Sequence, residues 1–428
     1  LTISSQNSAS YLTTPYFFAI SNYSDFTFSP RFYDNRENLY QGEYRHVTKK
    51  SSSTIDLSIR SNDTLIGKDN SSQSHFFINS SLKTNFELFD FSKIKLQLQN
   101  VSNNNYLKTY NLKSPIINSE TDLSSYLNFE GYSDDMEFTI SAEIYEDLNK
   151  ENDSDKFEHI SPNFSFSKIF ETNLNGTLSM KNTGYNKLFD TNKKEKAFIN
   201  NFNFKSLDYI NELGLINNFE ILIKNFNADS ENSSNFKNKT EHNLQGLLQI
   251  NSKLPLKKES ENFFSTLTPI FSAKINPYPN KDISNSDRII DYSNLFSTNR
   301  ISSDETLEGG ESITFGNEYK IFNQKNPNNE IFGFNLGTSF RRTENEDLPE
   351  SSYLNKKTSN IVGQMNLKTN EFIEFNYDFS SDNNLGEMNY HKFETSFKLN
   401  NFISTFEFVE ENNLFGNDSF IANETSYK

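Results

Sequence analysis

Apolar and polar residues alternate one by one in short runs that recur along most of this sequence. Residues 55–60, 94–99, 219–223, 332–340 and 373–379 each carry the pattern. Successive side chains of a β-strand point to opposite faces, so each run places one face against an apolar medium and the other against water. Helical spacing is rare, and no apolar run reaches the ~20 residues that a membrane-spanning helix needs. The pattern therefore predicts an all-β protein.

Clusters of turn-forming residues separate these runs. The clusters alternate between short and long, with the long ones near 147–161, 229–240, 276–308 and 343–357. Bacterial outer-membrane barrels have short periplasmic turns and longer outer loops. We expect roughly 22 antiparallel strands of about ten residues, which lies within the size range of such barrels. No repeat with a period of about 20–50 residues is present, which weakens a solenoid or propeller interpretation.

Composition decides between a disordered chain and a barrel. Only 34% of the 428 residues are hydrophobic and the net charge is -16, values that by themselves suggest disorder. The 42 Phe and 20 Tyr argue against it, because disordered chains are poor in aromatic residues. A large transmembrane β-barrel accounts for both facts, since only alternate residues of each strand face lipid. The acidic balance also argues against nucleic acid as a partner.

The stretch 15–30, PYFFAISNYSDFTFSP, predicts a β-hairpin in which each strand carries a proline. Two alternating aromatic runs flank the polar link 21–25. Proline has no backbone N–H and cannot donate to a strand ladder, so Pro15 and Pro30 weaken the pairing of consecutive strands. An ordinary edge hairpin whose prolines block aggregation is the simplest interpretation.

The same stretch resembles the first barrel hairpin of the LptD family, the lipopolysaccharide-assembly proteins of the Gram-negative outer membrane. That family's two prolines, aromatic pair, Asn and Asp-x-Thr correspond here to Pro15, Tyr16, Phe17, Asn22, Asp25, Thr27 and Pro30. Residues 31–47, with Gly-Glu-Tyr-Arg at 42–45, and residues 267–319 are similar to later segments of the family. The similarity keeps the family's order and spans most of the chain.

The resemblance implies an outer-membrane translocon, and no enzyme, that inserts lipopolysaccharide into the outer leaflet. Sugar would pass through the lumen, and lipid A would leave by a lateral gate between the first and last strands, weakened by Pro15 and Pro30. We expect Tyr16 and Phe17 to pack in that seam or against lipid, and Asn22 and Asp25 to form its turn. A general diffusion porin and a secreted β-rich surface adhesin remain as alternatives.

Further expectations follow from the resemblance. Family members have 26 strands, so residues 1–428 are expected to be one barrel domain, with an N-terminal periplasmic jellyroll domain before it and about four closing strands after it. An LptE-like lipoprotein plug would fill the lumen, and an LptA-like periplasmic protein would deliver lipopolysaccharide to the jellyroll domain. The chain has no Cys, a departure from relatives that join the two domains by disulfides.

No motif predicts catalysis, a cofactor or a metal site. The five histidines are scattered, which favours surface or lumen positions: His46, His75, His159, His242 and His391. One acidic run has EF-hand-like spacing but lacks the turn glycine, so we expect a solvated outer loop: Asp147, Asn149, Glu151, Asp153, Asp155 and Glu158. We expect the same of a second cluster: Asp304, Glu305, Glu308 and Glu311.

Overall fold

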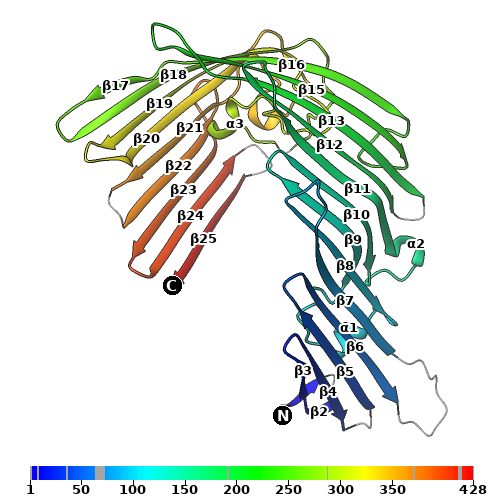
Figure 1. Cartoon of the computed structure of the whole chain (residues 1–428). Helices are drawn as coiled ribbons and strands as arrows, with labels where there is room; N and C mark the ends of the chain where they lie inside the picture. The colour runs from blue at the N-terminus through cyan, green and yellow to red at the C-terminus, as the bar shows by residue number, and fades with distance from the viewer. Residues whose placement is uncertain are drawn as a thin grey trace. The chain divides into compact units, whose positions relative to one another are not determined.

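The structure is a computed structural model in which the chain forms two compact units (Figure 1). It describes residues 2–6, 9–34, 37–62, 73–189, 192–286, 288–369, 372–412 and 417–427. Unit 1 comprises Leu1–Ile169, Met180–Asn200 and Asn227–His242. Unit 2 comprises Phe170–Ser179, Asn201–Phe226 and Asn243–Lys428.

Long strands make up nearly all of the regular structure. The first strands are β1 (Thr2–Gln6), β2 (Ala9–Thr13), β3 (Tyr16–Ser21), β4 (Ser24–Tyr33), β5 (Glu37–Val47), β6 (Ser51–Asn62), β7 (Gln73–Thr84), β8 (Phe91–Val101), β9 (Asp122–Ser133), β10 (Met136–Asp147), β11 (Phe157–Phe170), β12 (Gly176–Phe189) and β13 (Lys193–Ser206). The later strands are β14 (Tyr209–Ile210), β15 (Ile216–Glu231), β16 (Glu241–Lys253), β17 (Leu256–Glu259), β18 (Phe263–Asn276), β19 (Gly310–Asn323), β20 (Asn326–Arg341), β21 (Ile361–Lys368), β22 (Ile373–Ser381), β23 (Met388–Leu399), β24 (Phe402–Asn412) and β25 (Asn417–Tyr427).

Helices are confined to the connections between strands. They are α1 (Tyr106–Tyr110), α2 (Asp153–Lys156), α3 (Tyr292–Leu295) and the 3-10 turn η1 (Glu350–Ser352). Across the described part of the chain, no helix is both long enough and apolar enough to cross a membrane.

Each described pair of neighbouring strands is antiparallel, from β3–β4 to β10–β11 in unit 1 and from β17–β18 to β24–β25 in unit 2. Three hairpins contain broken strands: β2 and β3 both pair with β4, β14 pairs with β15, and β17 pairs with β18. Counting each broken strand once leaves 22 of the 25 described segments (25 minus three), in agreement with the number expected. The all-β antiparallel fold of the outer-membrane barrel class is confirmed.

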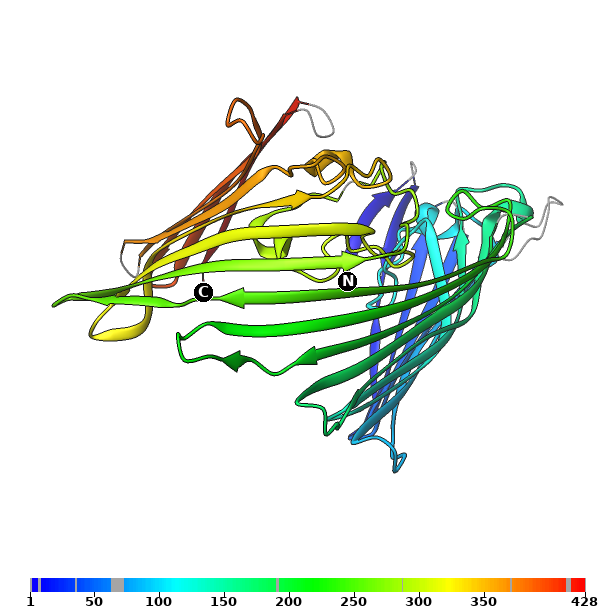
Figure 2. The same ribbon diagram turned by 90° about the horizontal axis from the view of Figure 1, so that it is seen from above.

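Short and long connections alternate through most of the chain. Consecutive antiparallel strands put successive connections at opposite ends of a sheet. In unit 2, Figure 2 shows the tight turn at 324–325 and the long connection 277–309 at opposite ends of β19. In bacterial outer-membrane barrels the short turns lie on the periplasmic side. The end of unit 2 that carries residues 324–325 is therefore the periplasmic end.

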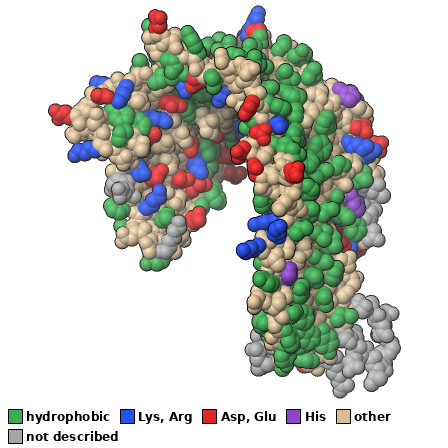
Figure 3. Space-filling model, viewed as in Figure 1, with side chains coloured by type: hydrophobic (Ala, Val, Ile, Leu, Met, Phe, Trp, Pro, Cys, Tyr) green, Lys and Arg blue, Asp and Glu red, His purple; other side chains and the backbone are tan. Residues whose placement is uncertain are grey.

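The two faces of the unit 1 sheet differ in chemistry. On β6, Leu57 and Ile59 are exposed, whereas Asp56 and Ser58 are buried on the opposite face. Figure 3 shows hydrophobic side chains gathered over the strands of unit 1. The buried face, here called the inner face, is covered by the connection 102–121, which packs a small core around α1. The outer face is apolar, as lipid contact requires.

In unit 2 the inner face is covered by the connections 277–309 and 342–360, which share an apolar core with β21. Two glycines let α3 approach the strands closely. A Cβ on Gly316 would lie 2.7 Å from the ring of Phe296, and one on Gly337 would lie 2.5 Å from Leu295. Gly316 of β19 and Gly337 of β20 are directly opposite each other, so together they form the surface on which α3 packs.

Candidate functional site

The predicted N-terminal hairpin is present, and its strand β3 forms an edge of the unit 1 sheet, whereas the preceding β2 is covered by β1, which pairs with it. β3 and β4 pair antiparallel and are joined by a turn at residues 22–23. Among the described residues, β4 is the one strand that pairs with β3. All residues of β3 are exposed, which is the environment of an edge strand without a neighbour on one side.

Pro15 and Pro30 are neighbours across this edge. β2 and β3 pair with β4 in one continuous register, which sets Thr14 opposite Pro30 and Pro15 opposite Ser29. The strand is interrupted at this point, because residues 14–15 belong to neither β2 nor β3.

The two prolines leave backbone N–H donors missing on both sides of the edge strand. Pro30 lacks the donor that β4 would offer to it, and Pro15 lacks the donor that it would offer on its other side. Opposed residues of an antiparallel pair alternate between hydrogen-bonded and non-hydrogen-bonded pairs. Thr14 N–H donates to Pro30 O at 3.1 Å, which makes these two a hydrogen-bonded pair. Pro30 cannot return the second bond because it has no N–H. One residue further on, the nitrogen of Pro15 points away from β4 toward the free edge, where it offers no donor.

The hairpin carries aromatic side chains on both faces. Arg31 of β4 bonds to the connection 102–121 and so marks the inner face. Strand alternation then puts Phe17 on the inner face of β3, and Tyr16 and Phe18 on its outer face. Phe17 is 61% exposed, so an apolar ring lines the inner side of the edge. Phe18 stacks on Phe26 of β4 with a centroid distance of 6.2 Å.

The two polar residues expected in the turn have different positions. Asn22 lies in the turn, as predicted. Asp25 does not form the turn, and that expectation is wrong: it lies in β4 and accepts a hydrogen bond from Arg45 Nε at 2.8 Å on the inner face. The hydroxyl groups of Ser21 and Ser24, 2.8 Å apart, hold the turn instead.

The opposite end of the hairpin is attached to the connection 102–121. Arg31 Nη1 donates to Tyr110 O, and the guanidinium lies 4.6 Å from the ring centroid of Tyr11 in β2. Tyr33 of β4 contacts Tyr110 edge-on, with ring centroids 6.2 Å apart. These contacts hold β2 and the end of β4 against the inner connection, whereas β3 has no such support.

His75 is buried on the inner face beneath the same connection, which fits the second of the surface or lumen positions expected for the histidines. His75 Nδ1 is 2.6 Å from Ser58 Oγ, and His75 Nε2 is 3.3 Å from Asp56 Oδ1. The Tyr106 hydroxyl is 2.7 Å from Ser58 Oγ. The order Ser–His–Asp is that of a hydrolytic triad, but Ser58 is buried and its hydroxyl group is bonded to that of buried Tyr106. The network therefore ties β6 and β7 to α1.

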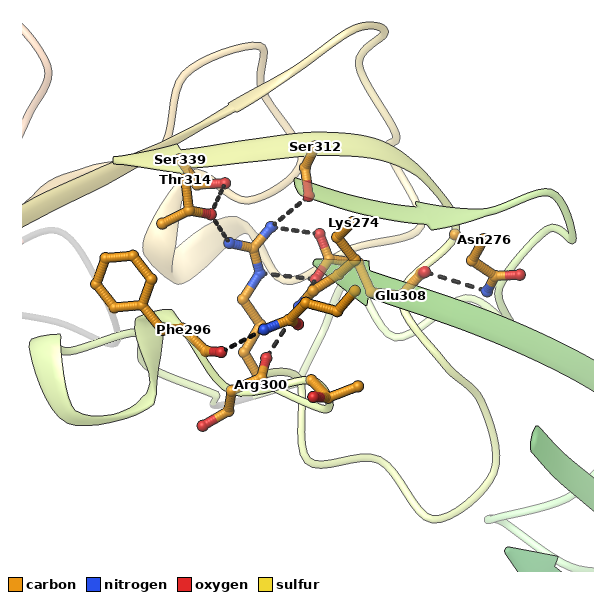
Figure 4. A network of polar contacts seen from close by, with 12 residues as sticks. Lys274, Asn276, Phe296, Arg300, Glu308, Ser312, Thr314 and Ser339 are labelled. Carbon is orange, nitrogen blue, oxygen red and sulfur yellow. Dashed lines mark hydrogen bonds and ion pairs between the residues drawn. The ribbon is translucent and has the colours of Figure 1, made fainter. Parts of the chain in front are cut away.

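In unit 2 the connection 277–309 is held by a buried carboxylate (Figure 4). Glu308 is 2% exposed and accepts hydrogen bonds from Arg300 Nε at 2.7 Å and from Arg341 Nη1. Lys274 Nζ of β18 lies 3.5 Å from the same carboxylate. Burial alone would raise the pKa of Glu308, but Arg300, Lys274 and Arg341 outweigh it and hold the pKa below the ordinary value of 4.5.

The expectation that this acidic cluster is solvated is wrong for Glu308. Glu305 and Glu311, expected to be solvated as well, are paired with Lys281 and Arg342. Sequence reasoning missed the cations around Glu308, although two of them lie inside the stretch 267–319 that shows the family similarity. Arg341, on β20, lies outside that stretch, and only the β19–β20 pairing brings it to Glu308.

The EF-hand-like run lies in the connection that contains α2. There Lys156 forms an ion pair with Glu146, which places a cation among the acidic side chains. No group of three or more acidic or imidazole side chains suited to a metal ion occurs among the described residues. The side chain of Asp153 lies outside them.

Comparisons with known proteins give one family. A model of the family described as LptD, LPS transport system D, matches residues 73–414. The matched range begins after the N-terminal hairpin. A comparison with curated proteins finds no match.

Two solved structures align over nearly the whole chain. The ferric preacinetobactin receptor BauA from Acinetobacter baumannii is 8% identical, with a TM-score of 0.30 over 98% of this chain and 77% of that one. The alcaligin outer-membrane receptor FauA from Bordetella pertussis is 7% identical, with a TM-score of 0.28 over 98% of this chain and 75% of that one.

Proposed function

Because the chain belongs to the LptD family of lipopolysaccharide transport proteins, we propose that the N-terminal edge of unit 1 is the lateral gate for lipid A. Members of this family work in transport and assembly at the outer membrane, and the family is not an enzyme family. The match favours lipopolysaccharide transport over the porin and adhesin alternatives.

The observation that carries the proposal is the position of the two prolines. An unpaired backbone group in hydrocarbon costs several kcal/mol, so a membrane barrel closes by pairing its first strand with its last. Pro15 offers no donor to a strand that pairs with β3, and Pro30 leaves a bond missing between this edge strand and β4. Pairing is therefore weakened on both sides of one strand. Such a strand opens at lower cost than its neighbours.

The side chains at the edge suit an amphiphilic substrate. Lipopolysaccharide joins a polar, phosphorylated sugar to acyl chains, so the two parts need different surroundings. Phe17 on the inner face and Tyr16 and Phe18 on the outer face give the acyl chains apolar contacts on both sides of the edge. The ion pair of Asp25 and Arg45 lies on the inner face, where the sugar would pass.

Family membership also supports the expected partners. We propose an LptE-like lipoprotein plug in the lumen, an LptA-like periplasmic donor, and a jellyroll domain and closing strands outside residues 1–428. The gate itself is passive, so the force for transport comes from these partners. No nucleotide-binding motif is present in the sequence.

Photocrosslinking in living cells tests the gate. A photoreactive amino acid at Phe17 should form an adduct with lipopolysaccharide while its synthesis continues. The same amino acid at Tyr126, an aromatic residue on the inner face of β9 and well away from the edge, is the matched control and should give little adduct. Equal adducts at both positions, or none at Phe17 while lipopolysaccharide reaches the cell surface normally, would refute the assignment.

A further inference from the structure

A pocket of about 440 Å³ lies on the inner face of unit 2, beside α3. Its volume falls within the range of roughly 300–1,000 Å³ that is typical of small-molecule sites. Three residues of the connection 277–309 form one side of it: Tyr292, Ser293 and Phe296. Seven strands supply the rest of the lining: β13, β15, β16, β18, β19, β20 and β21. The lateral gate proposed above uses none of these residues.

The lining residues of β13 and β15 point inward. Glu220 of β15 accepts a hydrogen bond from Thr298, which belongs to the inner connection. Asn218 lies two residues before Glu220 on the same strand and therefore has the same direction. Asn203 of β13 donates to Glu220 at 2.8 Å, so Lys205, two residues further on, also points inward.

The lining residues of β16 have the same orientation. Gln249 donates to the backbone oxygen of Phe296 at 2.7 Å, which fixes its direction toward the inner connection. Asn251 and Lys253 follow at intervals of two residues and share this direction. The pocket therefore opens toward the inside of unit 2 and not toward lipid.

Two lysines give the pocket its positive charge. Lys205 is the last residue but one of β13 and Lys253 is the last residue of β16, and β15 lies between these two strands. Neighbouring strands are about 4.8 Å apart, so the two backbones are roughly 10 Å apart and both flexible side chains can reach one anionic group. Among the described residues, neither ammonium group has an ion-pair or hydrogen-bond partner.

The one carboxylate of the lining already has partners. Glu318 Oε1 accepts a hydrogen bond from the Tyr292 hydroxyl at 3.5 Å, and its Oε2 lies 4.0 Å from Lys320 Nζ. Two lysines and one carboxylate leave the lining with a net positive charge. A neighbouring pocket of about 410 Å³, which shares Tyr292, Ser293 and Gln364, is lined by three carboxylates and one arginine. The positive charge is therefore particular to this pocket.

Side-chain amides from four strands line the same pocket: Asn218, Asn251, Asn335 and Gln364. Asn251 Nδ2 donates to Asn218 Oδ1 at 3.0 Å, and Asn335 Nδ2 donates to Gln364 Oε1 at 3.5 Å. Each amide has two donor hydrogens and an oxygen with two lone pairs, so donors and acceptors remain for a ligand. Hydroxyl groups also donate and accept, so a ligand rich in hydroxyl groups matches this lining.

We propose that this pocket binds a phosphorylated saccharide. Its hydroxyl groups bond to the amides, and its phosphate pairs with Lys205 and Lys253. A phosphate monoester carries a charge of about −1.5 to −2 at pH 7, which two ammonium groups balance. Tyr292 and Phe296 offer apolar contacts to the carbon atoms of the sugar rings. An acyl chain would take water from the amides and lysines and give them no partner in return.

The source of the saccharide rests on the proposed function. In a lipopolysaccharide transport protein, the transported glycolipid supplies the phosphorylated sugar. The two lysines then make the pocket selective for charged sugars over neutral ones.

Calorimetric titration of the purified full chain, together with its partners, tests the proposal. The first probe is an N-acetylated glucosamine disaccharide with a phosphate at each end. The second is the same disaccharide without phosphate, and the third is inorganic phosphate. We expect the first probe to bind most tightly, because it alone engages the lysines and the amides together. Inorganic phosphate that binds as tightly would refute the saccharide assignment.

Substitutions identify the pocket. Lys205→Gln combined with Lys253→Gln should weaken binding of the phosphorylated disaccharide about two- to thirtyfold, the range that two exposed ion pairs support. Arginine at both positions keeps the charge and should preserve binding. Lys398→Gln is the matched control, because Lys398 lies in β23 outside the pocket and pairs with Glu374. Equal binding of both disaccharides, or full affinity in the double glutamine variant, would overturn the proposal.

Two further outcomes separate this proposal from its neighbours. Binding that appears only after a plug protein has been removed would show that the plug fills the pocket, and the saccharide proposal would fail. Absence of binding while the photoreactive residue at Phe17 still forms its adduct counts against the pocket alone. Normal binding without that adduct counts against the gate alone.

Discussion

Replacing Pro15 and Pro30 with alanine should strengthen the backbone pairing on both sides of the N-terminal edge strand, here called the seam. Pro30→Ala restores a backbone N–H that can donate to Thr14 O. Pro15→Ala restores a backbone N–H on the side of the edge strand that faces away from β4. A hydrogen bond adds about 0.5–1.5 kcal/mol net, which corresponds to a roughly 2- to 13-fold smaller open population for each substitution. Where water cannot replace the missing partner, the effect lies at the upper end of this range.

The rate at which new lipopolysaccharide reaches the cell surface is the measurement, taken at equal abundance of assembled barrel. The double variant should slow delivery more than either single variant. Pro269→Ala is the matched control, because Pro269 lies inside β18, opposite Asn317 of β19 and away from the N-terminal edge. It should leave delivery unchanged.

Two results would refute this reasoning. The first is normal delivery in the double variant at normal barrel abundance, since the seam would then not limit export. The second is equal slowing by Pro269→Ala, which would show that added strand pairing anywhere in the sheet has this effect. Hydrogen exchange of the new amides at positions 15 and 30 reports separately whether the new bonds have formed, because paired amides exchange more slowly.

Three further predictions concern the inner connections. Glu308→Gln leaves buried Arg300, Arg341 and Lys274 without a counter-charge, at a cost of about 3–5 kcal/mol, and should accelerate protease cleavage within 277–309. The pKa of Glu308 is lowered from its ordinary value of 4.5, so the ionised carboxylate stabilises the fold fully above pH 4.5. This stabilisation is lost as the pH falls through the lowered pKa. If the unaltered protein were cleaved at pH 4.5 as fast as Glu308→Gln, this reasoning would be contradicted. Gly337→Ala should displace α3 and so increase protease cleavage near Tyr292. Gly246→Ala is the control: a Cβ at position 246 meets open space, so this variant should not change the cleavage. Tyr106→Phe removes the hydrogen bond to Ser58 and should lower the free energy of unfolding, measured by thermal denaturation, by about 0.5–1.5 kcal/mol. Burial raises the pKa of Tyr106 to about 12. The neutral phenol therefore contributes fully to the free energy of unfolding below pH 10, and this contribution disappears as the pH rises through 12. A difference in stability between the unaltered protein and Tyr106→Phe that does not change with pH would argue against it.

The class of fold and the direction of most strand side chains were predictable from the sequence. Alternation has a period of two residues in any strand, so a run such as 55–60 shows which residues share a face before any partner strand is known. The turn clusters between the runs then set the strand number. The N-terminal hairpin was predictable for the same reason, because a short turn brings its two strands together locally.

The sequence by itself determined local properties: the strands, their apolar faces and two prolines near one turn. Only the tertiary structure decided that these prolines are adjacent in register, that Asp25 pairs with Arg45, and that Glu308 is buried against Arg341 of another strand. The physical reason is the range of the interactions. Alternation and turns depend on neighbouring residues, whereas register, ion pairing and burial depend on segments that meet only when the strands are assembled into a sheet.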